Sequence, residues 1–289
     1  YRELHMMHSQ FNRPFFLAME CVPGSSLLCN YNTQQYFALR PSATQHGGDE
    51  RGTEAGAGAG AGAESGAESV IGAYSFAQRI GVIIALDIYL NNSDRIPTSV
   101  HDNEGNPNNL LLHPCRSVTG SPGAASRGEG EGGDDSSSGL GSIVGVDVFA
   151  IDTCVSTINA TTHQQLRRMY KLRVTSYLEK VYSPDPTVVA KALLRTKEFI
   201  YSETCYEASP QDCLDIAHGI RRGVQSIVSA LPPEVLAAEM SYLRALVQTD
   251  WNGVWAKSLA LVDLEFLGEM HGIFSRFGAG VSAGNARSV

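Results

Sequence analysis

Apolar residues in this 289-residue chain recur at helical spacing before a short polar stretch. Residues 70–90 place apolar side chains on one helical face, namely Phe76, Ile80, Ile83, Ile84, Ala85 and Leu90. The polar turn-formers Asn91-Asn92-Ser93-Asp94 follow, and Pro97 prevents the helix from resuming. The pattern therefore predicts a helix that ends at a polar loop.

The helical period returns later in the chain. It predicts four further helices over residues 186–200, 212–231, 232–248 and 252–277, with Asp212 as the N-cap of the second. Three runs have the pattern of buried strands: residues 13–24, which end in a Pro-Gly turn, residues 110–112 and residues 143–149. Together these elements predict an α+β fold in which helices stack on a small sheet.

Two stretches interrupt this pattern. Residues 45–68 and 117–142 consist mainly of Gly, Ala, Ser, Glu and Asp, which bury too little apolar surface to offset the entropy of ordering. We therefore expect one domain over residues 1–289 with disordered insertions at both places. The second insertion falls at the turn of a predicted β-hairpin, where a long loop adds little closure cost.

Charge restricts the classes of partner. The formal net charge is −8, which disfavours a nucleic-acid surface because such surfaces need clustered Lys and Arg. The basic residues Arg167, Arg168, Lys171 and Arg173 indicate a solvated helix face, with contact to a phosphate or an acidic partner as the alternative.

Membrane and zinc binding are both disfavoured by the sequence. The longest apolar run, residues 80–90, contains Asp87 and is far shorter than the ~20 residues needed to span a bilayer. The six cysteines form no CxxC pair, so we expect no zinc site and a reduced, cytoplasmic protein.

The polar loop after residue 90 carries candidate groups for phosphoryl transfer. Such a loop needs a carboxylate that orients the attacking hydroxyl and an amide oxygen that holds Mg2+ on the phosphates. Asp94 is the candidate carboxylate; the alternative is a structural turn next to Arg95. Arg95 either holds that carboxylate or the loop backbone through its planar guanidinium, or caps the helix. Asn92 either orders the loop or is a C-cap.

This loop resembles that of the actin-fragmin kinase catalytic domain family, which has an atypical protein-kinase-like fold. The likeness lies in the Asn-x-Asp-Arg-x-Pro run at residues 92–97 and the Gly-Asn-x-x-Asn run at residues 105–109, followed by an apolar triplet. It implies that Asp94 and Arg95 are catalytic and that Asn109 binds Mg2+. Asn106 and Asn108 compete for this role, and we choose Asn109 because it directly precedes the apolar strand.

The second metal ligand implied by the resemblance is Asp152. It ends an Ala-Ile-Asp run at residues 150–152, which the family also shows after its strand. In kinases, the strand after the catalytic loop delivers the aspartate that bridges Mg2+ and the phosphates. Asp147 is the rival, but it lies inside the strand pattern, where an outward-facing acid is the simpler explanation.

In a kinase-like fold, the strand at residues 13–24 would cross between the lobes. The resemblance therefore implies that the backbone of Glu20, Cys21 and Val22 binds the adenine of ATP. Residues 1–12 contain no glycine-rich loop and no lysine-bearing strand. We expect a fragment that is mainly the α-helical C-lobe, with the N-lobe largely absent, and that transfers phosphate poorly by itself because the phosphate-positioning lysine is missing.

The resemblance implies transfer of phosphate from ATP, with Mg2+, to Ser or Thr of a protein. Family members act on cytoskeletal proteins, either actin or tubulin, so a substrate of that kind is expected. Two alternatives stay open: a catalytically inactive kinase-like scaffold, and a helical interaction module that binds no nucleotide.

Overall fold

The computed structural model describes residues 26–27, 36–37, 74–116, 143–150, 155–247 and 253–278. Its helices are α3 (Phe76–Leu90), η3 (Pro107–Asn109), α4 (Gln164–Val181), α5 (Pro186–Ala192), α6 (Leu194–Thr204), α7 (Pro210–Ala230), α8 (Pro233–Leu246), α9 (Val254–Ala260) and α10 (Leu264–Gly278). Its strands are β1 (Ser26–Leu27), β2 (Leu110–Arg116) and β3 (Ile143–Ala150). The predicted α+β class is confirmed. The predicted strand at residues 13–24 and both predicted insertions lie outside the described residues.

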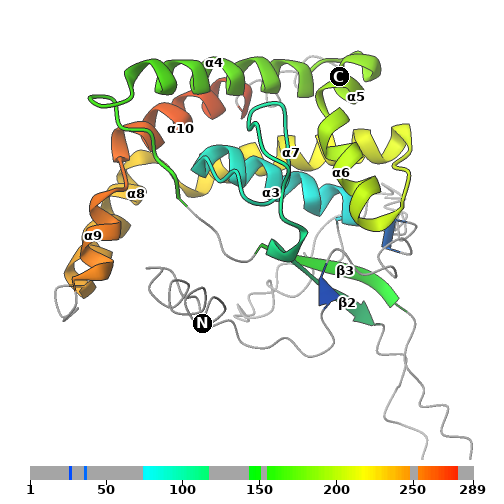
Figure 1. Ribbon diagram of the computed structural model, residues 1–289, viewed down its shortest axis with the longest axis horizontal. Helices are drawn as coiled ribbons and strands as arrows, with labels where there is room; N and C mark the ends of the chain where they lie inside the picture. Colours follow the sequence, from blue (N-terminus) through cyan, green and yellow to red (C-terminus); the bar gives the residue numbers. More distant parts are fainter. Residues whose placement is uncertain are drawn as a thin grey trace, which may run out of the picture.

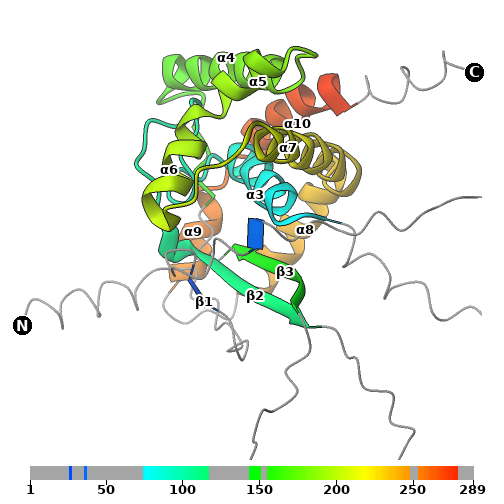
Figure 2. The same ribbon diagram turned by 90° about the vertical axis from the view of Figure 1, so that its right-hand side faces the viewer.

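The strands form one antiparallel sheet in the order β1-β2-β3. The β2–β3 hairpin pairs Leu110 with Ala150 and Leu112 with Val148, so β2 is longer than the run predicted at residues 110–112. The sheet lies on one side of the helices, next to α3 (Figures 1 and 2). Arg79 of α3 forms an ion pair with Asp147 of β3 at 2.7 Å. Asp147, the rival metal ligand, therefore has a partner that joins helix and sheet.

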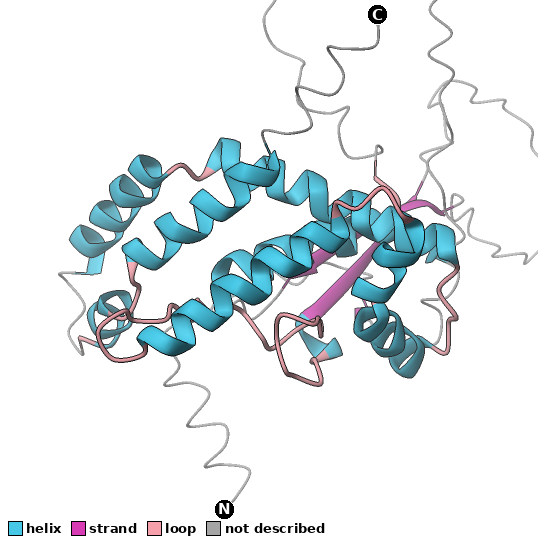
Figure 3. Cartoon of the chain, turned by 90° about the horizontal axis from the view of Figure 1, so that it is seen from above, coloured by secondary structure: helices cyan, strands magenta, loops and turns pink. Residues whose placement is uncertain are grey.

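Two helices cross in the centre of the molecule with their backbones in contact. A Cβ atom on Gly81 of α3 would lie 2.1 Å from the carbonyl oxygen of Ile216, and one on Gly219 of α7 would lie 2.0 Å from that of Gln78. These separations exclude any side chain, so only glycine permits this approach. Seen from above, the helices cover one face of the sheet (Figure 3).

Two of the predicted helices are divided in the structure. Leu193, with φ −95° and ψ 6°, separates α5 from α6. Residues 261–263 separate α9 from α10, where the carboxylate of Asp263 accepts hydrogen bonds from the backbone N–H groups of Glu265 and Phe266. A side chain that satisfies these free donors favours a new helix start, which hydrophobic periodicity does not reveal.

The predicted N-cap of α7 is wrong by three residues. Ser209 is the N-cap, and its hydroxyl accepts from the backbone N–H of Asp212 at 3.1 Å. Asp212 is the third helical residue, and its carboxylate accepts from the N–H of Ser209 at 2.8 Å. The two residues form a reciprocal capping box.

Helix α4 was predicted only as a solvated helix face around Arg167 to Arg173, without bounds, because most of its residues are polar. Its buried residues nevertheless recur at helical spacing, namely Arg167, Tyr170, Val174, Tyr177, Leu178 and Val181. None of the described helices is long and apolar enough to cross a membrane.

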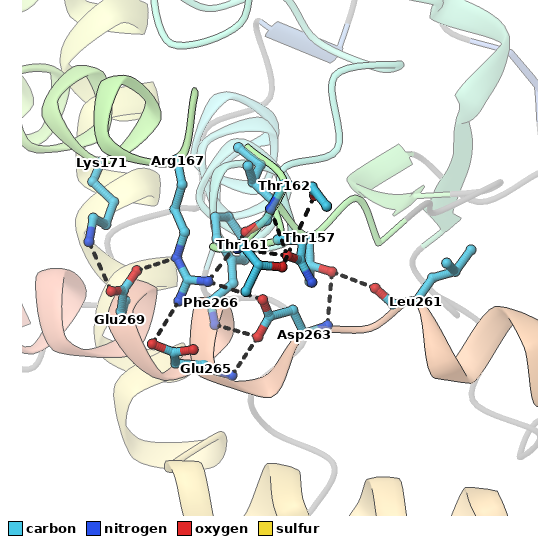
Figure 4. A network of polar contacts seen from close by, with 12 residues as sticks. Thr157, Thr161, Thr162, Arg167, Lys171, Leu261, Asp263, Glu265, Phe266 and Glu269 are labelled. Atoms are coloured by element: carbon cyan, nitrogen blue, oxygen red, sulfur yellow. Dashed lines mark hydrogen bonds and ion pairs between the residues drawn. The ribbon is translucent and has the colours of Figure 1, made fainter. Parts of the chain in front are cut away.

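The prediction of a solvated Arg167 is wrong, because this side chain is 3% exposed. It lies 3.0 Å from the Asp263 carboxylate and 2.7 Å from that of Glu269, and it donates to the carbonyl oxygen of Ile158 at 3.4 Å (Figure 4). These two carboxylates come from α10 itself and from the residue that precedes it. Arg167 therefore joins α4 and α10 through charge as well as packing.

The helix crossing predicts an asymmetric response to added methyl groups. Gly219→Ala should lower the free energy of unfolding by about 1–3 kcal/mol, because the methyl group meets the α3 backbone and forces the helices apart. Gly272→Ala on α10 is the matched control, since its Cβ would contact nothing within 4 Å, and it should stabilise by ~0.5–1 kcal/mol. Urea unfolding measures both; equal effects would contradict the close crossing.

Candidate functional site

The candidate loop begins at a left-handed residue that ends α3. Asn91 has φ 51° and donates its backbone N–H to the Ile88 carbonyl, so it is the C-cap. Its side-chain amide donates to the carbonyl oxygen of Ser156 at 2.7 Å, and the N–H of Ser156 donates to Leu90 at 3.0 Å. The end of α3 is thus fixed to the segment that follows β3 in the sequence.

Asn92 orders the loop, which resolves the two alternatives for it. Its side chain is buried. Its amide donates to Oδ1 of Asp87 at 3.0 Å, while its own Oδ1 accepts from the N–H of Asp94 at 3.3 Å. Asn92 therefore connects the last turn of α3 to the backbone of the candidate catalytic residue.

The structure brings Asp94 and Asn109 together although they are fifteen positions apart in the sequence. The Nδ2 atom of Asn109 donates to the backbone oxygen of Asp94 at 2.9 Å and to its carboxylate Oδ2 at 3.2 Å. Both partners are acceptors, so they fix which end of the amide faces Asp94. Among the described residues, Oδ1 of Asn109 has no hydrogen-bond donor and stays available as an acceptor.

Asp94 and Asn109 differ in their exposure to solvent. Asp94 is exposed, whereas Asn109 is buried at 5% exposure. Asn106, a rival for metal binding, accepts from the N–H of Asn108 and caps η3. Asn108, the other rival, is exposed. Of the three asparagines, Asn109 is the one with a described contact to Asp94.

Arg95 lies in the protein interior with an exposed fraction of 0%. Its Nη1 atom contacts Oδ1 of Asp87 in a direct ion pair. Its Nε atom donates to the backbone oxygen of Asn109 at 3.2 Å. Arg95 therefore holds the loop backbone, which is one of the alternatives considered for it. Its guanidinium is itself held by the buried Asp87 carboxylate on α3.

Asp87 shares this burial, with an exposed fraction of 2%. Burial raises the pKa of Asp87 to about 7, and Arg95 and the Asn92 amide oppose the rise because both donate to the carboxylate. Removing Arg95 would leave only Asn92 to oppose the burial effect and would favour the protonated carboxyl. The ionised form of Asp87 therefore depends on Arg95.

The long loop between Arg95 and Asn109 is anchored at both ends and in its middle. The N–H of Asn106 donates to the backbone oxygen of Arg95 at 3.0 Å and closes the loop at its base. From α6, Arg195 donates to the backbone oxygen of His101 at 3.3 Å, and Thr196 donates to that of Pro97 at 2.9 Å. These contacts hold the loop without regular secondary structure of its own.

His101 inserts from this loop towards α4. The Tyr170 hydroxyl donates to the carbonyl oxygen of Ile88 at 2.6 Å, so the Nε2 atom of His101, 3.2 Å away, must donate to that hydroxyl. The Nδ1 atom is then the bare nitrogen, and it has no partner among the described residues. Burial lowers the pKa of His101 to about 4, so the ring is neutral near pH 7.

Four predicted site residues lie outside the described residues: Asp152, Glu20, Cys21 and Val22. Ala150, the last residue of β3, pairs with Leu110, which directly follows Asn109. Among the residues that the structure describes, no three His, Cys, Asp or Glu side chains cluster as a metal site would require. That finding does not test the predicted magnesium ligands, because Asn109 is an asparagine and Asp152 lies outside the described residues.

Asp87 is the site residue that sequence reasoning missed. It appeared only as a charge that interrupts an apolar run. A charged residue in the buried stripe of a helix usually has a partner, and Arg95, eight positions further on, was the nearest arginine that followed. This argument could have identified the pair.

The α+β fold and the polar loop between α3 and β2 are consistent with a kinase-like catalytic domain, and comparison with known proteins shows the family. The family described as "Actin-fragmin kinase, catalytic" matches residues 3–224, and the chain belongs to this family. The chain is also 23% identical over 259 residues to a Dictyostelium discoideum protein provisionally named an actin-fragmin kinase. That match covers 89% of this chain and 48% of the relative, so the chain spans about half the length of the curated relative it matches.

Removing the buried carboxylate should destabilise the protein strongly. We expect Asp87→Ala to lower the free energy of unfolding by about 3–5 kcal/mol, because it removes the direct ion pair between Asp87 and the buried Arg95 guanidinium. Asp102→Ala is the matched control, since that carboxylate is 90% exposed and pairs with Arg195 on the surface; it should change stability by less than about 1 kcal/mol. Denaturant titration compares them, and similar losses would contradict the role of Asp87.

Acidification should destabilise the protein in part through His101. Its folded pKa lies below the unfolded value of about 6.5, so the unfolded chain binds more protons between about pH 6.5 and 4 and stability falls as the pH falls. Between pH 7 and 4.5 this amounts to about 2–3 kcal/mol. A His101→Gln variant should lack this part of the loss. Parallel denaturant titrations at both pH values test this, and an unchanged pH dependence would contradict it.

Proposed function

We propose that this chain is part of an ATP- and Mg2+-dependent phosphotransferase that acts on Ser or Thr of a protein. The observation that supports this best is the contact between Asn109 and Asp94. It brings a carboxylate and an amide of the kind used in phosphoryl transfer into one site. Family membership supports the same chemistry independently.

In this proposal Asp94 orients the acceptor hydroxyl and accepts its proton. The carboxylate is exposed and can therefore approach a protein substrate. The Nδ2 atom of Asn109 restrains the Asp94 carboxylate by donating to it, while Arg95 acts as a positioning residue through the backbone of Asn109. Arg95 was predicted to be catalytic, and its burial favours this indirect role.

Mg2+ would be held by Oδ1 of Asn109 together with Asp152. The donor set fits the ion, because Mg2+ prefers carboxylate and carbonyl oxygens. Asp152 follows the last residue of β3 by two positions, a reach of about 7 Å, and that last residue pairs with the neighbour of Asn109. When bound, Mg2+ would neutralise charge on the phosphates of ATP.

The remaining parts of the proposal follow the family resemblance. The described helices and the β2–β3 hairpin correspond to a kinase C-lobe, and the backbone of Glu20, Cys21 and Val22 would bind adenine. The relative's name refers to actin and fragmin, so we propose a cytoskeletal protein substrate, of the actin or tubulin kind, and a cytoplasmic enzyme.

Phosphate transfer from Mg-ATP to purified actin and tubulin tests this proposal with the full-length protein. Asp94→Asn should lower the rate about 10²- to 10⁴-fold, as loss of a general base does, and Asn109→Ala should weaken the response to Mg2+. Asp102→Asn is the matched control, because it changes an exposed aspartate of the same loop, and it should leave the rate unchanged.

Two results would contradict the proposal. Equal transfer by wild type and Asp94→Asn would exclude Asp94 as the catalytic carboxylate. Nucleotide binding without transfer to any protein would favour the kinase-like scaffold instead.

A further inference from the structure

The outer side of α4 and the adjoining part of α10 carry basic side chains without counter-charges. Arg168, Arg173 and Arg276 are exposed. None of them forms an ion pair with a carboxylate within the part of the chain that the structure describes. This excess of positive charge is unusual in a chain with a net charge of −8.

A groove of about 450 Å³ runs between α4 and α10. Arg168, Lys171 and Thr175 line it from α4, and Ile273 and Arg276 line it from α10. The carboxylate of Glu269 also borders the groove, but its two oxygens already bind Arg167 at 2.7 Å and Lys171 at 2.9 Å (Figure 4). The groove therefore keeps a net positive charge after its internal ion pairs are formed.

Three large apolar side chains continue from this groove along α4. Leu166, Met169 and Leu172 are 57%, 44% and 55% exposed. Leu172 lines the groove itself, while Leu166 and Met169 line a second hollow of about 500 Å³ together with Arg173. Their spacing of three residues puts them on one side of the helix. Large apolar side chains that are exposed together on one side of a helix favour an interaction surface.

The position of this surface separates it from the sheet and from Asn109, which directly precedes β2. α4 and α10 lie on the side of the molecule away from the sheet, with α3 and α7 between them and β2 (Figures 1 and 2). β2 begins directly after Asn109. A partner bound to α4 and α10 would therefore leave the opposite side of the domain free.

We propose that this α4–α10 surface docks an acidic, amphipathic segment of a protein partner. Carboxylates of the segment would meet Arg168, Arg173 and Arg276, and its apolar side chains would cover the strip formed by Leu166, Met169 and Leu172. The strip distinguishes this partner from a nucleic acid, whose phosphates need the arginines alone. Docking does not depend on the proposed phosphotransferase activity, because no catalytic-loop residue takes part in it.

Binding of a labelled synthetic peptide to the whole chain, without nucleotide, tests the proposal. The probe is a helical peptide with Glu on one face and Leu on the other, measured by fluorescence anisotropy. The double variant Arg168→Glu, Arg276→Glu should bind about tenfold or more weakly, because two attractions become two repulsions. Higher salt should weaken wild-type binding. Arg244→Glu, an exposed arginine on α8, should bind as the wild type does.

A second pair of variants tests the apolar half of the surface. Met169→Ser with Leu172→Ser should weaken binding of the same peptide severalfold, whereas Leu243→Ser, 39% exposed on α8, should not. A peptide with Ser in place of Leu should bind weakly. No binding by the wild type, equal binding by the Arg168→Glu, Arg276→Glu variant, or equal binding of the Ser-containing peptide would each overturn the proposal. Circular dichroism of each variant confirms that it is folded.

Discussion

The ion pair between Asp87 and Arg95 is the interaction on which the candidate site depends. Both side chains are buried, and each continues into a hydrogen bond that reaches the loop. Asp87 holds Asn92, which accepts from the backbone of Asp94, and Arg95 holds the backbone of Asn109. Two routes therefore lead from one buried carboxylate to the exposed Asp94 and to the buried Asn109 that contacts it. A buried pair of this kind contributes little net stability because both charges lose their hydration, and its value here is geometric.

The position of Asp87 depends in turn on the helix that carries it. α3 is fixed against α7 by a crossing in which Gly81 and Gly219 bring the two backbones into contact. It is fixed to the sheet by Arg79 and Asp147. Its C-terminal end is fixed by two hydrogen bonds, one from the Asn91 side chain to Ser156 and one from the N–H of Ser156 to Leu90. Helix α7, the sheet and the segment after β3 thus all restrain α3. Small displacements of α3 would move both Asp94 and Asn109.

The sequence predicted the parts of the site that follow local rules. The end of α3, the polar loop and the strand after Asn109 could be read because turn-formers, proline and an apolar run mark them directly, and the loop motif led to Asp94 and Asn109. The links that depend on tertiary packing could not be read in the same way. The burial of Arg167 and the partner of Arg95 depend on which helices meet, and the helix starts at Leu194 and Leu264 depend on local capping and turns within apolar runs. Polar residues at helical positions that the pattern predicts to be buried, such as Asp87, were the most informative feature that the predictions did not use.

Asn109 follows Asp94 by fifteen positions, whereas in ordinary protein kinases the asparagine follows the catalytic aspartate by about five. This greater loop length has a physical explanation. A longer loop costs little extra closure entropy, but a catalytic loop must also be held in one geometry. Here the extra residues contribute that restraint, because His101 donates to Tyr170 on α4 and Arg195 and Thr196 on α6 bind the loop backbone. The added loop residues therefore connect the candidate site to α4 and α6. In this family member, a longer loop is compatible with a rigid site because its added residues bring their own anchors.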